Sequence, residues 1–395
     1  MRLPLLLGLL AQLIPGLWFT EQPREYRSLV EGDAIYFSAP VPEKLPAGTW
    51  VQFGVTLENG GDKAPRHYIV EVLQGRKWEC ISKPLHTDGL SRYSFVTALS
   101  TDRHPSTYLE LFRLSRPVSD SLRVRCRVCS NYAADRSELS RDDPDNRVSV
   151  REKYYIGARL TPLGRKAPAE HKKVLMTGNS FTYYYGVPFM LQEIAFSQGL
   201  ELDINASLKG GQTFRQHTRL VLSMMNCSLE QYDYAFLQGQ SQENARYALD
   251  LSAGRDVKMA VCDLCDAIRT TSPGCNIFIE NTWAYPAGDW GGFGSADRFD
   301  SLLDEGTRKL AFASHTSISP VGQAFAAVRN DDDAPADLLG DDHKHQSLAG
   351  SYLKACVEYL LISGKPFKGD VPCCGLDGDT AGYLRSIAEK TVLTQ

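Results

Sequence analysis

Residues 173–182 read KVLMTGNSFT, an apolar stretch that runs directly into a glycine, an asparagine and a serine. The stretch from Val174 to Thr177 predicts a buried strand, and Gly178 predicts a tight turn before a helix. Such a turn presents the hydroxyl of Ser180 at the end of the strand. Because a serine hydroxyl is a poor nucleophile without a base, catalysis also requires a histidine and a carboxylate nearby in the fold.

Strands and helices alternate along the chain from about residue 171. The pattern predicts strands at 174–177, 202–207, 234–238, 276–280 and 317–321, and helices at 188–197, 213–225, 256–270, 297–314 and 347–362. This alternation is typical of a parallel sheet covered by helices on both faces, whose ligands bind at the carboxyl ends of the strands. We therefore expect an α/β sandwich with Ser180 at its ligand-binding edge.

The preceding part of the chain has a different pattern. Short alternating runs separated by turn residues extend over 25–160 and predict an all-β sandwich. The polar, proline-bearing segment 161–170 reads as a linker. We expect the α/β domain to occupy 171–370 and a C-terminal extension to occupy 371–395.

Charge and the N-terminus limit where the protein acts. The 43 Lys and Arg against 47 Asp and Glu give a formal net charge of −4, which favours neither nucleic acid nor an anionic membrane. The apolar run from Leu3 to Ile14 predicts a signal peptide within residues 1–20, and hence a secreted or periplasmic protein. No run approaches the roughly 20 apolar residues that a membrane-spanning helix needs.

Further candidate site residues stand at predicted strand ends and before the last predicted helix. Gly211 could bring a backbone N–H close to a ligand, and Gln238 could donate from its amide to a developing oxyanion. Asp342 stands three residues before His345, so that it could fix the histidine tautomer and leave the other ring nitrogen for Ser180. His343 has no such carboxylate; with His345 it could instead bind a metal, but further zinc-type ligands are missing nearby.

Together these blocks resemble the SGNH (GDSL-type) hydrolase superfamily, and in particular a Bacteroidetes-type branch with a GNSFT motif. The resemblance covers about 171–364 and implies a flavodoxin-like α/β/α sandwich and a serine esterase without metal or organic cofactor. It implies that Ser180 is the nucleophile and first oxyanion donor, that Gly211 is the second donor, and that Asp342 and His345 complete the triad. The third block departs from the family, because Gly-Gln-Ser-Gln at 239–242 lacks the usual asparagine. By similarity to related sugar acetyl esterases, which use a glutamine just before this glycine, we expect Gln238 to replace the missing oxyanion asparagine, with Asn244 as the fallback.

Substrate contacts are less defined by the sequence. An aromatic loop after a predicted strand could stack on a sugar ring through Trp283, Tyr285 and Trp290, or it could pack beneath the loop. Asn179, beside the nucleophile, is a further candidate contact. The resemblance implies an acylated carbohydrate or another small ester as the substrate. An inactive carbohydrate-binding or surface-assembly protein and an acyltransferase stay open as alternatives.

Overall fold

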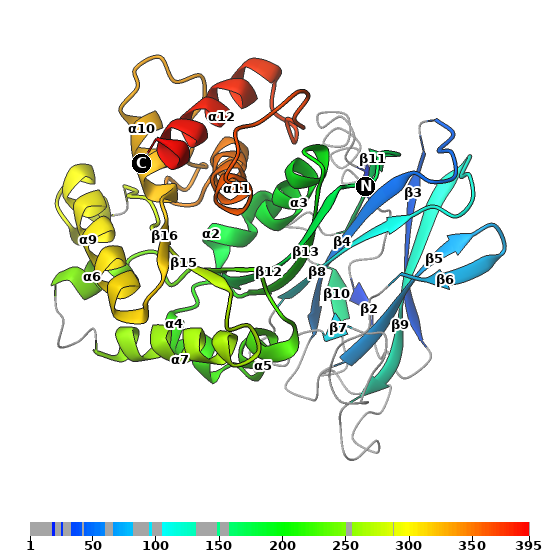
Figure 1. Cartoon of the computed structure of the whole chain (residues 1–395), viewed down its shortest axis with the longest axis horizontal. Coiled ribbons are helices and arrows are strands. Elements are labelled where there is room, and N and C mark those ends of the chain that lie inside the picture. Colours follow the sequence, from blue (N-terminus) through cyan, green and yellow to red (C-terminus); the bar gives the residue numbers. More distant parts are fainter. Residues whose placement is uncertain are drawn as a thin grey trace. The chain divides into compact units, whose positions relative to one another are not determined.

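The computed structural model describes residues 18–19, 25–26, 33–41, 43–59, 66–81, 95–96, 105–131, 148–150, 158–249, 255–286 and 288–394. The chain divides into two compact units, Met1–Ala167 and Pro168–Gln395 (Figure 1). Apart from residues 18 and 19, the predicted signal peptide lies outside the described residues, so it stays a prediction. No helix in the described ranges is both long and apolar enough to cross a membrane.

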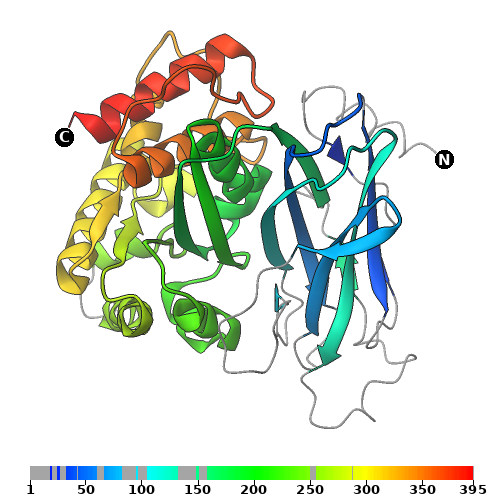
Figure 2. The same ribbon diagram turned by 45° about the vertical axis from the view of Figure 1, so that its right-hand side comes forward.

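The N-terminal unit is built from antiparallel strands, drawn mainly in blue and cyan in Figure 2. In one group β4 pairs with β8, β10 and β11, while β1 pairs with β11 and β2 with β10. In the other group the order is β3-β9-β5-β6, and β7 pairs with β5. The strands are β1 (Trp18–Phe19), β2 (Glu25–Tyr26), β3 (Ala34–Pro40), β4 (Trp50–Asn59), β5 (Arg66–Gln74), β6 (Lys77–Cys80), β7 (Phe95–Val96), β8 (Pro105–Arg113), β9 (Ser121–Asn131), β10 (Val148–Val150) and β11 (Ala158–Gly164).

Both groups of strands contribute to one apolar core. Phe37 of β3 and Phe53 of β4 are buried, and their ring centroids lie 5.6 Å apart. Val72 and Val124 add β5 and β9 to the same cluster. In β3, β4, β5 and β9 alternate residues lie in this core, as expected for strands with one buried face.

The segment predicted as a linker, 161–170, is structured at both of its ends. Its first four residues belong to β11, where Pro162 lies opposite Val51 of β4 beside a register shift. Proline donates no backbone hydrogen bond, and it is tolerated at a bulge or on a strand edge. Only residues 165–169 connect β11 to the next strand, β12 (Glu170–Gly178).

The C-terminal unit contains a five-stranded parallel sheet in the order β13-β12-β14-β15-β16. After β12 come β13 (Leu200–Leu208), β14 (Tyr234–Leu237), β15 (Asn276–Glu280) and β16 (Ser317–Ser319). Numbered along the chain, this is the doubly wound order 2-1-3-4-5, whose direction reverses beside the first strand. The predicted parallel α/β sheet is confirmed, and the carboxyl end of β12 lies at the reversal point.

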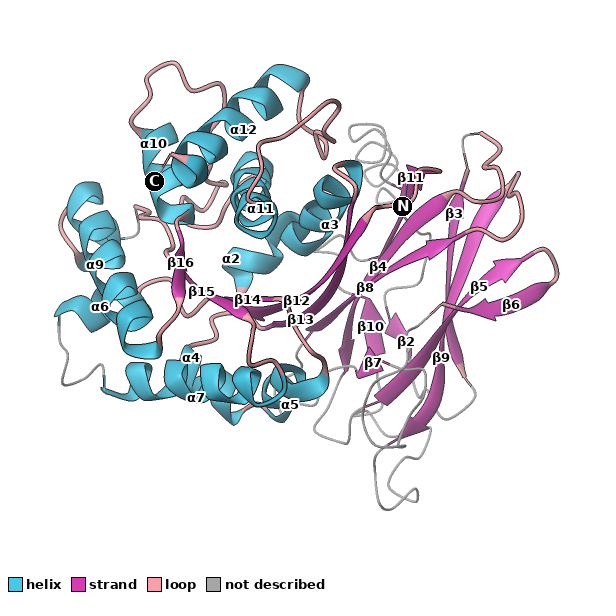
Figure 3. Ribbon diagram, in the orientation of Figure 1, coloured by secondary structure: helices cyan, strands magenta, loops and turns pink. Residues whose placement is uncertain are grey.

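Successive residues of the strands feed two separate cores. Val174 and Met176 of β12 lie in one buried cluster, whereas Leu175 lies in another. The first cluster is completed chiefly by the helices α3 (Val187–Ser197), α10 (Val321–Arg329), α11 (Leu348–Ser363) and α12 (Gly378–Leu393). The second is completed by α4 (Phe214–Arg219), α5 (Val221–Leu229) and α7 (Arg255–Thr271) (Figure 3). Helices therefore cover both faces of the sheet. This explains why β12 reads as a continuous apolar run rather than an alternating one.

The helices of this unit include one that the sequence pattern did not predict. Residues 371–395, expected as an extension, contain α12, whose Leu384 and Ala388 are fully buried in the same core as α11. The helices are α2 (Ser180–Tyr183), the 3-10 helix η3 (Tyr184–Gly186), α3 (Val187–Ser197), α4 (Phe214–Arg219), α5 (Val221–Leu229), α6 (Glu243–Leu249), α7 (Arg255–Thr271), α8 (Gly288–Gly292), α9 (Ala296–Ser314), α10 (Val321–Arg329), α11 (Leu348–Ser363) and α12 (Gly378–Leu393).

Candidate active site

The turn after β12 places Ser180 at the carboxyl end of the sheet. Asn179 has extended backbone angles and caps the one-turn helix α2 by accepting a hydrogen bond from the N–H of Phe181 at 3.1 Å. Ser180 is the first residue of this helix and is 8% exposed. Its hydroxyl therefore lies where parallel α/β sheets bind their ligands.

Asn179 also joins this turn to two neighbouring strand ends. Its amide nitrogen donates to the carbonyl oxygen of Gln212, after β13, at 3.0 Å and to that of Gly239, after β14, at 2.8 Å. Both amide protons and one lone pair of the oxygen are thus used inside the protein. Because Asn179 is only 2% exposed, the structure gives it a structural role and does not support the predicted substrate contact.

His345 and Asp342 approach Ser180 from the loop before α11. The His345 Nε2 atom lies 2.8 Å from Ser180 Oγ, and Nδ1 lies 2.5 Å from Asp342 Oδ2. A carboxylate can only accept, so Nδ1 carries the proton and Nε2 is left to accept from the serine hydroxyl. The structure thus brings the three predicted triad residues into a single series of contacts.

The loop itself fixes Asp342. Its Oδ1 accepts from the backbone N–H groups of Lys344 at 3.0 Å and His345 at 2.9 Å. Burial would raise the pKa of Asp342, but the hydrogen bonds from the His345 ring and from these two N–H groups outweigh it and hold the pKa below its usual range. The carboxylate is therefore ionised at neutral pH, as an acceptor for the imidazole must be.

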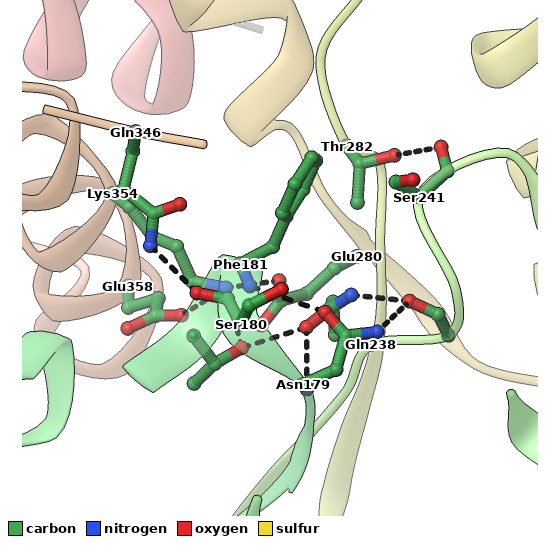
Figure 4. A network of polar contacts seen from close by, with 12 residues as sticks. Asn179, Ser180, Phe181, Gln238, Ser241, Glu280, Thr282, Gln346, Lys354 and Glu358 are labelled. Atoms are coloured by element: carbon green, nitrogen blue, oxygen red, sulfur yellow. Dashed lines mark hydrogen bonds and ion pairs between the residues drawn. The ribbon is translucent and has the colours of Figure 1, made fainter. Parts of the chain in front are cut away.

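Two aromatic rings and an amide hold His345 against the turn formed by Asn179 and Ser180. Tyr184 stacks on the imidazole with centroids 4.2 Å apart, and Phe181 meets its edge at 5.5 Å. The adjacent Gln346 donates from Nε2 to the carbonyl oxygen of Ser180 at 3.2 Å (Figure 4). The sequence predicts no role for Gln346, and none against the histidine ring for Tyr184. Their positions beside His345 and Ser180 are the signal that could have indicated them.

The two predicted backbone donors to an oxyanion are the N–H groups of Ser180 and Gly211. Within the described residues, the N–H groups of Ser180 and Gly211 make no hydrogen bond. Gly211 is exposed and has φ +67°, a left-handed conformation that glycine adopts without strain. The predicted roles of both N–H groups stay predictions, and these geometries are compatible with them.

The Gln238 side chain lies against the turn formed by Asn179 and Ser180 and is fully buried. Its Oε1 accepts from the N–H of Asn179 and from the hydroxyl of Thr182, both at 3.0 Å, while Nε2 donates to the carbonyl oxygen of Gly239. These contacts give Gln238 a structural function at the turn. Its predicted oxyanion role is not needed to explain its position, and it stays a prediction. The fallback, Asn244, instead donates to the carbonyl oxygen of Glu280 and to Thr307, inside the packing.

The aromatic loop after β15 is mostly buried rather than open to a substrate. Trp283 is 1% exposed and lies between the rings of Phe181 and Phe325, at 4.1 and 4.2 Å. Tyr285 is 0% exposed and bonds to the Ser241 hydroxyl at 2.9 Å. The predicted sugar-stacking role is therefore wrong for these two rings, which pack beneath the loop. Trp290 is partly exposed and packs against the same core.

Metal ligands are not assembled near the two histidines. Among the described residues, no group of three or more His, Cys, Asp and Glu side chains is arranged to hold a metal ion. His343 is exposed, and its backbone has φ +50°. His345 contacts Ser180 and Asp342 instead.

A buried cluster of charged residues, which the sequence did not predict, lies beside the turn formed by Asn179 and Ser180. Lys354 and Glu358 of α11 are 0% exposed, and Glu280 at the end of β15 is 2% exposed. Lys354 and Glu358 are the only charged residues in 348–362, an otherwise largely apolar helix, and four residues separate them. This pattern could have indicated them, because buried charges are nearly always paired.

A pH-dependent stability is expected from Glu243, the first residue of α6. Its Oε2 accepts from the N–H groups of Phe214 and Gln240 at 3.1 and 3.0 Å. Burial raises the pKa of Glu243 from 4.5 to about 7, although these two bonds lower it. The folded state therefore binds the Glu243 proton more tightly than the unfolded state does. The contribution of this difference to the free energy of unfolding is complete below the unfolded pKa and is lost as the pH rises through about 7.

Glu243→Gln should therefore stabilise the protein under mildly basic conditions and remove this part of the pH dependence. A shift of this size corresponds to about 3 kcal/mol at most, and glutamine keeps an acceptor oxygen without the charge. The measurement is urea unfolding of both proteins at about pH 5 and about pH 8. Glu305→Gln, on the more exposed part of α9, is the control. Equal pH dependence in wild type and Glu243→Gln would contradict the prediction.

Comparisons with known proteins give distant similarities. No family model and no curated protein matches the chain. A DUF4886 family protein from Bacteroides uniformis is 19% identical, with a TM-score of 0.47 over 56% of this chain and 95% of that chain. A provisional SGNH hydrolase from Slackia heliotrinireducens is 24% identical, with a TM-score of 0.40 over 50% and 100% of the two chains. A mutant of an acetyl-xylooligosaccharide esterase from Geobacillus Stearmophilus is 14% identical, with a TM-score of 0.36 over 52% and 99%.

Proposed function

We propose that the protein is a serine esterase whose catalytic triad is Ser180, His345 and Asp342. The observation that supports this most is the series of contacts from Asp342 through the imidazole to the Ser180 hydroxyl, between elements 165 residues apart in the chain. A helix cap or a turn would account for Ser180 alone. It would not account for a histidine in the required tautomer at 2.8 Å from its oxygen.

The proposed reaction has two half-reactions with the same proton carrier. In the first, His345 Nε2 takes the proton of Ser180 Oγ as that oxygen attacks the ester carbonyl, and it then returns the proton to the leaving alkoxide. The acyl group is left on Ser180. In the second, Nε2 takes a proton from water as the water oxygen attacks the acyl-enzyme, and it then returns this proton to Ser180 Oγ as the acid is released. Asp342 holds the ring orientation and stabilises the imidazolium in both.

We assign the stabilisation of the oxyanion first to two backbone N–H groups. The N–H groups of Ser180 and Gly211 have no hydrogen bond within the described chain, which supports their use by a developing negative charge. Preorganised donors of this kind are each worth roughly 10²–10³ in rate. Gln238 holds the turn; one proton of its Nε2 bonds to the carbonyl oxygen of Gly239, so only the second proton could be offered to an oxyanion.

We propose O-acetyl or related acyl groups on carbohydrate as the substrate class. Support comes from the resemblance of the motif blocks to SGNH hydrolases and from the separate all-β unit, which we propose to be a β-sandwich accessory domain. The predicted signal peptide would place this enzyme outside the cytoplasm, in the periplasm or medium. No metal or organic cofactor enters the proposed steps.

The test uses the full-length wild-type protein. We expect hydrolysis of a short-chain aryl acetate, release of acetate from one or more acetylated polysaccharides, and labelling by a fluorophosphonate probe. Mass spectrometry should locate the probe on the peptide that contains Ser180. A folded protein that is neither labelled nor active on any aryl acetate would refute the proposal. Glycan binding by such a protein would instead indicate the inactive carbohydrate-binding alternative.

A further inference from the structure

A charged cluster lies buried on the inner side of the nucleophile turn (Figure 4). The Nζ atom of Lys354 donates to a carboxylate oxygen of Glu280 and to the hydroxyl of Thr182, the latter at 3.0 Å. The Glu358 carboxyl lies 3.7 Å from the same nitrogen. All three charged side chains are at least 98% buried, since none is more than 2% exposed. Burial of this kind is costly, so the cluster needs an explanation beyond packing.

Hydrogen bonds lead from Lys354 through Thr182 and Gln238 to the backbone of the turn, and the donor of each is fixed by its chemistry. An ammonium group can only donate, so Thr182 accepts from Lys354 and must donate its own proton elsewhere. Its partner is Gln238 Oε1 at 3.0 Å, which also accepts from the N–H of Asn179 at 3.0 Å. Lys354 therefore sets the direction of the Thr182 hydroxyl and, through it, which end of the Gln238 amide faces the turn.

The strand end has no room for a side chain at position 178. A Cβ atom added to Gly178 would lie 2.7 Å from both Gln238 Oε1 and Thr182 Oγ1. Separations below 3.0 Å are essentially never seen, so the hydrogen-bonded oxygens lie directly against the backbone that precedes Asn179 and Ser180. A small movement of either oxygen would be transmitted to the nucleophile.

The charges of the cluster are nearly balanced. Burial raises the pKa of Glu358 well above its usual range, which outweighs the attraction of Lys354 and is reinforced by the Glu280 carboxylate. Neither Glu358 oxygen has a hydrogen bond within the described residues. Burial thus favours the neutral acid at Glu358, and Lys354 forms its ion pair with Glu280.

We infer that Lys354 is a positioning residue for Ser180, acting through Thr182 and Gln238 on the Asn179 turn. The inference rests on the proposed esterase function. Lys354 touches neither substrate nor reacting atoms; it fixes the backbone that aims the serine hydroxyl at His345. Misplacement of a catalytic group by a fraction of an ångström to 1 Å can cost up to about 10²-fold in rate.

The test is the pair Thr182→Val and Thr182→Ser in the full-length protein. Valine keeps the shape and removes the hydroxyl, so kcat and the fluorophosphonate labelling rate should fall by about 10-fold to 10²-fold with KM nearly unchanged. Serine keeps the hydroxyl and should restore most of the loss. Thr391→Val, which removes a hydroxyl bond inside α12, is the control and should leave kcat unchanged.

Each outcome decides between the two proposals. Unchanged kcat in Thr182→Val, or an equal loss in Thr182→Ser, overturns the positioning inference while the esterase function stands. An inactive and unlabelled wild-type protein overturns the esterase function and the inference with it. If Thr182→Val does not fold, the double variant Lys354→Met/Glu280→Gln decides instead. It removes the ion pair without leaving a lone charge, and a lowered kcat at unchanged KM supports the inference, whereas a wild-type kcat overturns it.

Discussion

Ser180→Ala should abolish ester hydrolysis and probe labelling while leaving the fold intact. Loss of a serine nucleophile lowers kcat by roughly 10⁴ to 10⁶, because the remaining oxyanion donors and binding contacts cannot form an acyl-enzyme. The hydroxyl makes one hydrogen bond within the described chain, to His345, so alanine removes little stabilisation. The measurement is kcat on an aryl acetate together with thermal unfolding. A variant with more than about a tenth of wild-type kcat would show that another nucleophile acts.

The two neighbouring histidines provide a matched control for the proton carrier. His345→Asn should reduce kcat by a similar order of magnitude, since asparagine cannot carry the proton. His343→Asn should leave kcat unchanged, because this side chain is exposed and asparagine tolerates its φ of +50°. Equal losses in both variants would contradict the assignment of the base to His345.

Lys354→Met should cause the largest loss of stability among the substitutions considered. The change leaves the Glu280 carboxylate buried without its ammonium partner, at 2% exposure. Breaking a buried ion pair from one side costs about 3–5 kcal/mol, a large part of the stability of a domain. The measurement is the free energy of unfolding from urea denaturation, compared with wild type at the same pH.

The double variant Lys354→Met/Glu280→Gln separates charge from packing. Because glutamine carries no charge, it should recover a large share of the lost stability, about half or more. A single variant as stable as wild type would mean that the pair contributes nothing. A double variant no more stable than the single one would mean that lost packing around the lysine stem is the cause.

The residues of the proposed triad could be predicted from the sequence because each has a local signal. Ser180 follows an apolar strand and a glycine, and Asp342 stands three residues before His345, as the turn that joins them requires. The parallel sheet followed from the alternation of strand and helix patterns. These features depend on residues that are close together in the chain, where periodicity and turn chemistry are informative.

The side chains around the proposed triad are held by contacts between residues far apart in the chain, and the sequence does not show such contacts. Nothing near Gln238 indicates that its oxygen faces Asn179, 59 residues earlier in the chain. The loop sequence leaves open whether Trp283 stacks on a substrate or packs beneath the loop, and only its contacts with Phe181 and Phe325 show that it packs. Helix α12 was missed because its short pattern follows a proline- and cysteine-bearing segment, and only packing against α11 makes its apolar face evident.

The hydrogen bonds of Asn179 have a consequence for engineering this site. One amide connects the turns after β12, β13 and β14, so a loop taken from another protein at any one of them would disturb the other two. Libraries intended to change substrate preference belong elsewhere. Within the described chain, residues 290–294 after β15 make no hydrogen bond to Asn179, and Gly292 and Gly294 are exposed there, so changes around them would leave these three turns intact.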